Sequence, residues 1–106
     1  MRRRISRKVL GGAVALAGAV LAVPAAANED LRIGLVTGGC VGCHGSAGSG
    51  GHGIPKIAGT LSRGDFVAKM KAFRDDQSNP TVMNRIARGY SDEEFALMAL
   101  RWAKAE

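Results

Sequence analysis

The chain has 106 residues, enough for one domain, and its 15 Lys and Arg against 9 Asp and Glu give a net charge of +6. Five of the cations lie within the first eight residues, so residues 28–106 carry ten cations and nine acids and a net charge of +1. The excess of positive charge belongs to the N-terminal segment, and the remainder shows no basic patch that would support nucleic-acid binding.

Residues 1–27 have the organisation of a secretory signal peptide. Five cations come first, an uncharged run from Val9 to Val23 follows, and three alanines end the segment. The run is rich in Ala and Gly and is shorter than the roughly 20 strongly apolar residues that a membrane-spanning helix needs. We therefore expect cleavage before Asn28, which leaves one domain of residues 28–106 in the periplasm without membrane insertion. An uncleaved anchor is the alternative.

The first element of this domain is a short predicted helix. Leu31 to Val36 is apolar and follows two acidic residues, which favour a helix N-terminus. The Thr-Gly-Gly sequence at residues 37–39 is predicted to end the helix before Cys40. The glycine-rich stretch 45–53 is predicted to be an irregular loop that wraps one edge of a bound group.

Two further helices begin at capping boxes. The first box, at residues 62–65, predicts a helix up to about Arg74, and the second, at residues 91–94, predicts a helix that runs close to the C-terminus. Tyr90 and Phe95 take the positions of a hydrophobic staple at the second cap. Each helix carries an apolar stripe on one face: Phe66, Met70 and Phe73, then Phe95, Met98, Ala99 and Trp102.

The segment between these two helices is less regular. Residues 75–80 break the first helix, and residues 81–88 contain a short turn or helix that Gly89 terminates. No segment shows the alternation of a strand, so we expect an all-α domain of three or four helices joined by long loops. A domain of this size is only marginally stable on an apolar core alone, which favours a bound group at its centre.

Cys40-Val41-Gly42-Cys43-His44 is a C-x-x-C-H haem-attachment pattern. Two cysteines three residues apart in one turn can reach both vinyl groups at one edge of a porphyrin and form thioethers. His44 follows at once, so its imidazole is held next to the iron as a ligand. The pattern predicts one haem c, bound covalently through Cys40 and Cys43.

Two other interpretations of these cysteines are less favoured. A C-x-x-C disulfide redox motif needs a βαβ pattern, which the sequence does not show. A zinc site needs four ligands, and the candidates Cys40, Cys43, His44 and His52 would all fall within 13 residues.

The second axial ligand of the iron is predicted to be Met83. A methionine sulfur raises the reduction potential of a histidine-ligated iron. Met70 and Met98 lie on the apolar stripes, where core packing explains them, whereas Met83 lies in a loop-like stretch between the helices. His52 is a poor alternative, because it is only eight residues from His44 in the same loop.

Pro55 follows the glycine-rich loop and is a candidate partner of His44. A backbone carbonyl that accepts the Nδ1 proton would orient the ring and increase its basicity, and Pro55 could supply it. A proline that merely stiffens the loop is the other interpretation, and both stay open.

Together these residues resemble a class I cytochrome c over residues 30–104. The resemblance implies an N-terminal helix, C-x-x-C-H, a proline loop, a middle helix, a methionine loop and a C-terminal helix around one haem. It also implies that a glycine of the first helix meets an aromatic residue of the last. Gly34 and Trp102 are the candidates, with Gly38 as an alternative glycine.

A narrower resemblance rests on TVMNRIARGY at residues 81–90, the SDEEFALMA that follows, CVGCHG and IPKIAG. These segments are similar to the cytochrome subunit of flavocytochrome c sulfide dehydrogenases. In that family the methionine of the motif is the axial ligand, which implies Met83 here. The better-known members carry two haem domains, whereas this chain has one C-x-x-C-H.

The resemblance implies an electron-transfer protein rather than an enzyme, with no catalytic residues of its own. Its expected partner is an FAD-containing sulfide dehydrogenase subunit, from which the haem accepts electrons. The alternative is a free soluble cytochrome c that shuttles electrons between other redox proteins of a respiratory chain. A haem enzyme such as a peroxidase would need an open iron position, which Met83 is expected to fill.

Overall fold

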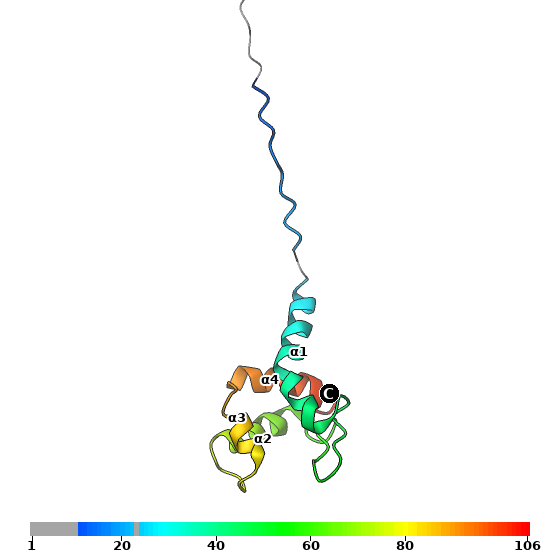
Figure 1. Cartoon of the computed structure of the whole chain (residues 1–106), viewed down its shortest axis with the longest axis vertical. Helices are drawn as coiled ribbons and strands as arrows, with labels where there is room; N and C mark the ends of the chain where they lie inside the picture. Colours follow the sequence, from blue (N-terminus) through cyan, green and yellow to red (C-terminus); the bar gives the residue numbers. More distant parts are fainter. Residues whose placement is uncertain (1–10, 23) are drawn as a thin grey trace, which may run out of the picture.

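The computed structural model describes residues 11–22 and 24–106, and these contain four helices and no β-strand (Figure 1). The helices are, in chain order, α1 (Ala25–His44), α2 (Arg63–Arg74), α3 (Val82–Ala87) and α4 (Asp92–Trp102). The prediction of an all-α fold is confirmed. No helix in the described part of the chain is long and apolar enough to cross a lipid bilayer.

The predicted signal peptide lies partly outside the described residues, which exclude residues 1–10 and 23. Residues 11–22 are exposed and without regular structure, and they lead away from the helices (Figure 1). Helix α1 begins at Ala25, so the predicted cut before Asn28 falls within its exposed first turn. Cleavage stays a prediction.

Helix α1 is longer than the sequence pattern indicated, and the predicted end at residues 37–39 was wrong. The helix continues to His44, where Gly45, with φ of +86°, ends it. Each glycine in a helix costs about 1 kcal/mol relative to alanine, so tertiary contacts must offset the cost of the two adjacent glycines at residues 38 and 39. The buried Thr37 hydroxyl supplies one contact, because it accepts a hydrogen bond of 2.7 Å from Arg101 of α4.

Gly39 shows why a glycine is placed in the middle of α1. A Cβ atom at this position would lie 2.8 Å from the Tyr90 hydroxyl oxygen. The missing side chain therefore allows Tyr90, which precedes α4, to approach the backbone of α1.

The N-cap serines place the starts of α2 and α4 as predicted, but the reciprocal bond of a capping box is formed at α4 and not at α2. The Ser62 hydroxyl accepts a hydrogen bond of 3.1 Å from the Asp65 N–H at the start of α2. At α4 the Ser91 hydroxyl accepts from the Glu94 N–H at 3.2 Å, and the Glu94 carboxylate accepts from the Ser91 N–H at 2.8 Å. The staple next to it is formed as well, since the rings of Tyr90 and Phe95 have centroids 6.5 Å apart.

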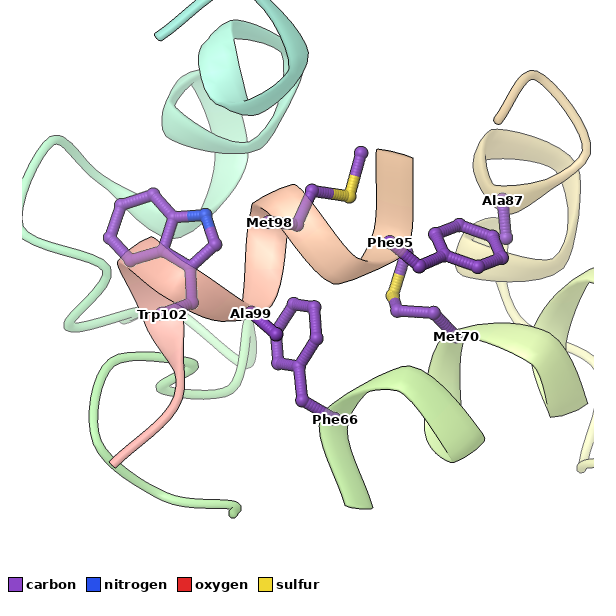
Figure 2. Close-up of a cluster of buried hydrophobic side chains, with 7 residues drawn as sticks. All are labelled: Phe66, Met70, Ala87, Phe95, Met98, Ala99 and Trp102. Atoms are coloured by element: carbon purple, nitrogen blue, oxygen red, sulfur yellow. The ribbon is translucent and has the colours of Figure 1, made fainter. Parts of the chain in front are cut away.

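The apolar stripes of α2 and α4 meet in one core. In Figure 2 two side chains of α2, Phe66 and Met70, reach towards α4. Seven residues form this core: Phe66, Met70, Ala87, Phe95, Met98, Ala99 and Trp102. All but Ala87 of α3 and Phe66 and Met70 of α2 belong to α4, so α4 is the central element of the fold.

The crossing of α1 with α4 corrects one expectation. Among the described residues, nothing lies within 4 Å of a Cβ built on Gly34 or on Gly38, so neither makes the predicted close contact with Trp102. Trp102 packs instead on Gly48 of the glycine-rich loop, where a Cβ would lie 2.6 Å from the indole ring. The reason is that α1 meets α4 further along, at Thr37, and the loop after α1 folds back against the end of α4.

Candidate functional site

A cavity of about 850 Å³ is enclosed by all four helices and the loops between them. Its volume falls in the range of roughly 300–1,000 Å³ that is common for cofactor sites. Its walls are mostly apolar, with Ile57, Leu61 and Phe66 among them. In the described part of the chain α1 and α3 do not contact each other although both line the cavity, so the cavity separates them.

The C-x-x-C-H residues occupy the last turn of α1 and line this cavity. Positions three and four apart share one face of a helix, so Cys40, Cys43 and His44 are presented together. Cys40 is half-buried and Cys43 is exposed. Burial raises the pKa of the Cys40 thiol, against smaller lowering effects of the Trp102 side chain and the Arg101 charge. A thiol with a raised pKa is not prepared to act as a thiolate nucleophile.

His44 is oriented by a hydrogen bond to the backbone of Pro55, the candidate partner named from the sequence. Its ring is 7% exposed, and Nδ1 lies 2.7 Å from the backbone oxygen of Pro55. A carbonyl can only accept, so Nδ1 carries the proton and Nε2 of the neutral ring is left with a free lone pair. This is the tautomer that a histidine needs to bind a metal through Nε2.

The glycine-rich loop brings Pro55 to His44. The Gly50 N–H donates a hydrogen bond of 2.8 Å to the His44 carbonyl, and residues Gly51 and Ile54 exchange two hydrogen bonds of 2.9 Å. Gly50 has a φ of +70°, and a Cβ there would collide with the Ile54 carbonyl oxygen. The turn can therefore form only with glycine at residue 50, and it places the Pro55 carbonyl beside the imidazole.

All three methionines of the helical region line the cavity, but only Met83 lies outside the fully buried core. Met70 and Met98 are 7% and 0% exposed and belong to the core. Met83 is half-buried at the edge of the core. The stretch that looked loop-like is the short helix α3, and Met83 lies in its first turn, with its N–H donating to the Thr81 hydroxyl at 3.1 Å.

The four donors considered for zinc do not form a metal site. Within the part of the chain that the structure describes, no three His, Cys, Asp or Glu side chains lie close enough to hold one metal ion. His52 is exposed and has a φ of +52° in the glycine-rich loop.

One polar group at the cavity fits a haem and was missed by the sequence analysis. The Ser78 hydroxyl is buried, lines the cavity region and has no hydrogen-bond partner among the described residues. Lys69 and Asn79 line the same cavity. A haem carries two propionate carboxylates, which would accept from such donors. No sequence signal marks Ser78, because it lies in an irregular segment. The apolar walls, the free Nε2 and the two thiols complete a site that suits the group.

Comparison with known proteins finds no matching protein-family profile but two similar cytochromes. The chain is 38% identical over 86 residues to cytochrome c-554(548) of Halomonas halodenitrificans, which covers 77% of this chain and 96% of that protein. It is 38% identical over 60 residues to the cytochrome subunit of sulfide dehydrogenase of Chlorobaculum tepidum, which covers 57% of this chain. That second match spans 54% of the relative, about half of its length.

Proposed function

The chain belongs to the c-type cytochromes and is an electron carrier rather than an enzyme, and from this premise we propose a more specific function. It holds a single haem c through thioethers at Cys40 and Cys43, with His44 and Met83 as axial ligands. It works in the periplasm as the cytochrome subunit that accepts electrons from an FAD-containing sulfide dehydrogenase subunit.

The hydrogen bond between His44 and Pro55 is the observation that carries the ligand assignment. It leaves Nε2 free and buries the ring against the cavity into which the two cysteines of α1 also face. When bound, a haem c supplies a one-electron couple at its iron. The chain itself binds and orients that group and, through its apolar walls, limits the access of water, which affects the reduction potential.

Met83 is the methionine best suited to the second ligand position. Moving Met70 or Met98 to an iron would open a hole in the core, whereas Met83 can turn towards the cavity from the edge of the core. It also lies on α3, across the cavity from the helix that carries His44. These features support His44 and Met83 as the two residues that would hold the iron of a bound haem.

The rim of the cavity at α3 supports a docked partner. Val82 is 66% exposed and Ile86 is 37% exposed, and both line the cavity. Val82 also borders a shallow surface hollow with Pro80 and Arg85. Exposed apolar side chains beside a cofactor mark an interaction surface. The near-neutral charge of residues 28–106 suits a lasting contact more than long-range electrostatic steering.

The identity of the partner is supported by chemistry and by one relative. A haem transfers single electrons and cannot take two from sulfide at once, so a flavin, which can accept two and release them one at a time, must come between them. The relative from Chlorobaculum tepidum is named as the cytochrome subunit of a sulfide dehydrogenase. Residues 81–90, which carry the resemblance to such subunits, include the exposed rim of α3.

A free carrier is the second candidate function. The match to cytochrome c-554(548) spans 96% of that protein, so a chain of this kind also exists under the name of a simple cytochrome. In this case the same apolar rim would serve short-lived contacts with several redox proteins.

Mixing the purified holoprotein with the FAD-containing subunit and sulfide separates the two candidates. We expect haem reduction, followed at the reduced absorption bands, only when all three are present. Val82→Asp places a charge in the apolar contact. It should raise the flavoprotein concentration needed for half of the maximal rate of haem reduction about tenfold. Leu35→Asp is the matched control, because Leu35 is 72% exposed on α1, outside the cavity rim. Absence of reduction by the flavoprotein would favour the free carrier.

A further inference from the structure

Helix α3 is anchored in an unusual way for an element that carries an iron ligand. It has six residues, and its buried residues are Asn84 and Ala87. Ala87 is buried, Met83 is half-buried and Ile86 is 37% exposed, so apolar packing contributes only part of what positions α3. Polar contacts must supply the rest.

These contacts converge on one carboxylate, that of Asp76, in the loop after α2. Asp76 accepts hydrogen bonds from Arg88 Nη2 at 2.7 and 2.9 Å and from Asn84 Nδ2 at 3.2 Å. Asn84 lies within α3 and Arg88 directly after it, so the carboxylate contacts α3 at two places. The hydrogen bonds from Asn84 and then Arg88 lower the pKa of Asp76 below its ordinary value of 3.8, so the carboxylate stays charged to a more acidic pH than a free aspartate does.

The Asn84 amide is almost fully buried and forms hydrogen bonds through both its oxygen and its nitrogen. It is 5% exposed, and its Oδ1 accepts from the Thr81 N–H at 3.1 Å while its Nδ2 donates to Asp76. Thr81 in turn accepts from the Met83 N–H at 3.1 Å. The chain of contacts therefore runs from Asp76 through Asn84 and Thr81 to the backbone of Met83.

Asp76 itself is held in a conformation that non-glycine residues rarely adopt. Its φ is +54°, in the left-handed region, which costs of the order of 1–2 kcal/mol for a residue with a side chain. Such a conformation persists only where surrounding contacts determine it. The contacts at Asp76 are those of a helix C-cap, because the Gln77 N–H donates to the Ala72 carbonyl at 2.8 Å and the Asp76 N–H to the Phe73 carbonyl at 3.3 Å. Asp76 is therefore fixed to the end of α2, and its side chain joins that end to α3.

We propose that Asp76 and Asn84 are positioning residues that hold Met83 on the iron and keep competing ligands off it. The inference rests on the proposed role of Met83 as axial ligand. Without the Asp76 carboxylate, the Asn84 amide loses its partner and α3 can move away from the cavity more often. Each such movement leaves the iron open to an external ligand, so the population of the open state sets how tightly that ligand binds.

Imidazole binding to the ferric holoprotein measures this population. We expect Asp76→Ala to increase the imidazole affinity about tenfold, the size of effect that loss of a hydrogen-bond pair produces. Asp76→Asn keeps an oxygen acceptor for Asn84 but not the charge for Arg88, and it should give a smaller increase. Met83→Ala, which lacks the competing sulfur, sets the upper limit.

Asp92→Ala is the matched control. Asp92 is an exposed, ion-paired carboxylate like Asp76, but its partners Lys71 and Arg74 lie on α2, at 3.0 and 2.7 Å, and not on α3. We expect this variant to bind imidazole as the unmodified protein does. An equal increase in Asp76→Ala and Asp92→Ala would show a general loss of stability and overturn the proposal.

The outcomes also separate this inference from the ligand assignment. If Met83→Ala binds imidazole much more tightly while both Asp76 variants match the unmodified protein, Met83 is the ligand and the positioning role is refuted. If Met83→Ala itself matches the unmodified protein, the ligand assignment fails instead. The near-infrared band of sulfur-ligated ferric iron, recorded for each variant, reports the same ligand independently of stability.

Discussion

The contact between Gly48 and Trp102 provides a quantitative test of how the glycine-rich loop is held against α4. Gly48 has a φ of +65°, and a Cβ at this position would lie 2.6 and 2.8 Å from two atoms of the Trp102 ring and 3.1 Å from the Ala58 side chain. Gly48→Ala therefore carries two costs. The left-handed backbone costs about 1–2 kcal/mol, and the forced displacement in a packed region costs about 1–3 kcal/mol more.

Gly59 separates these two costs. Its φ of +67° is almost the same as that of Gly48, but nothing among the described residues lies within 4 Å of a Cβ built there. We expect Gly59→Ala to lose only the backbone part, about 1–2 kcal/mol. The difference between the two variants measures the steric conflict, mainly with Trp102 and to a smaller extent with Ala58. Most of it should disappear when Trp102→Leu is introduced as a second change, in a double-mutant cycle.

Denaturant unfolding of the ferric holoprotein, followed by far-UV circular dichroism, is the appropriate assay, because a covalent haem stays attached in the unfolded state. We expect Gly48→Ala to lower the free energy of unfolding by about 2–5 kcal/mol. Equal losses for Gly48→Ala and Gly59→Ala would refute the packing of Trp102 on the loop. The reasoning would also fail if the difference between them persisted in the Trp102→Leu background.

Three further predictions concern the cofactor and the ion pairs. Haem should survive denaturation and organic extraction with the pyridine haemochrome spectrum of two thioethers, and Cys40→Ala or Cys43→Ala should give largely haem-free, unstable protein; haem that washes out would disprove covalent attachment. Met83→Ala should abolish the near-infrared band of the oxidised protein and lower the reduction potential; a band lost in Met98→Ala but kept in Met83→Ala would reverse the ligand assignment. Hydrogen bonds from Lys71 and then Arg74 lower the pKa of Asp92 below its ordinary value of 3.8, so its contribution to stability is complete above that pH and is lost as the pH falls further. The melting temperature of Asp92→Asn should therefore lie below that of the unmodified protein at pH 7, and the two should converge as the pH falls well below 3.8; a gap that is constant with pH would contradict this.

The starts of α2 and α4 could be read from the sequence because their signals are local, whereas α1 begins at Ala25, ahead of the acidic residues expected at its start. Ser62 and Ser91 each bond to the backbone three residues later, and such a contact forms whatever the rest of the chain does. The short helix α3 is capped in the same way, by Thr81, and lies within residues 81–88, where a short turn or helix was expected. The C-x-x-C-H pattern is local too, since one turn of helix brings its three side chains to one face.

The end of α1 could not be predicted because it depends on residues far along the chain. Thr-Gly-Gly at residues 37–39 is a helix terminator by local preference, and only contacts with Tyr90 and Arg101 reverse this. The same holds for the choice among glycines. Gly34 was expected at the crossing with α4, but α1 contacts α4 at Thr37 instead.

The residues of the candidate site also fall into two groups, those indicated by local sequence patterns and those placed by contacts between distant parts of the chain. The sequence by itself determined the candidates, which are the two thiols, the histidine and Met83, because spacing and the apolar stripes distinguish these residues without a structure. Only the tertiary structure decided that the Pro55 carbonyl meets His44, that Ser78 lines the cavity and that Asp76 holds α3. Each of those relations joins residues that lie apart in the chain or in irregular segments, where backbone torsions are set by packing and hydrogen bonds rather than by local preference.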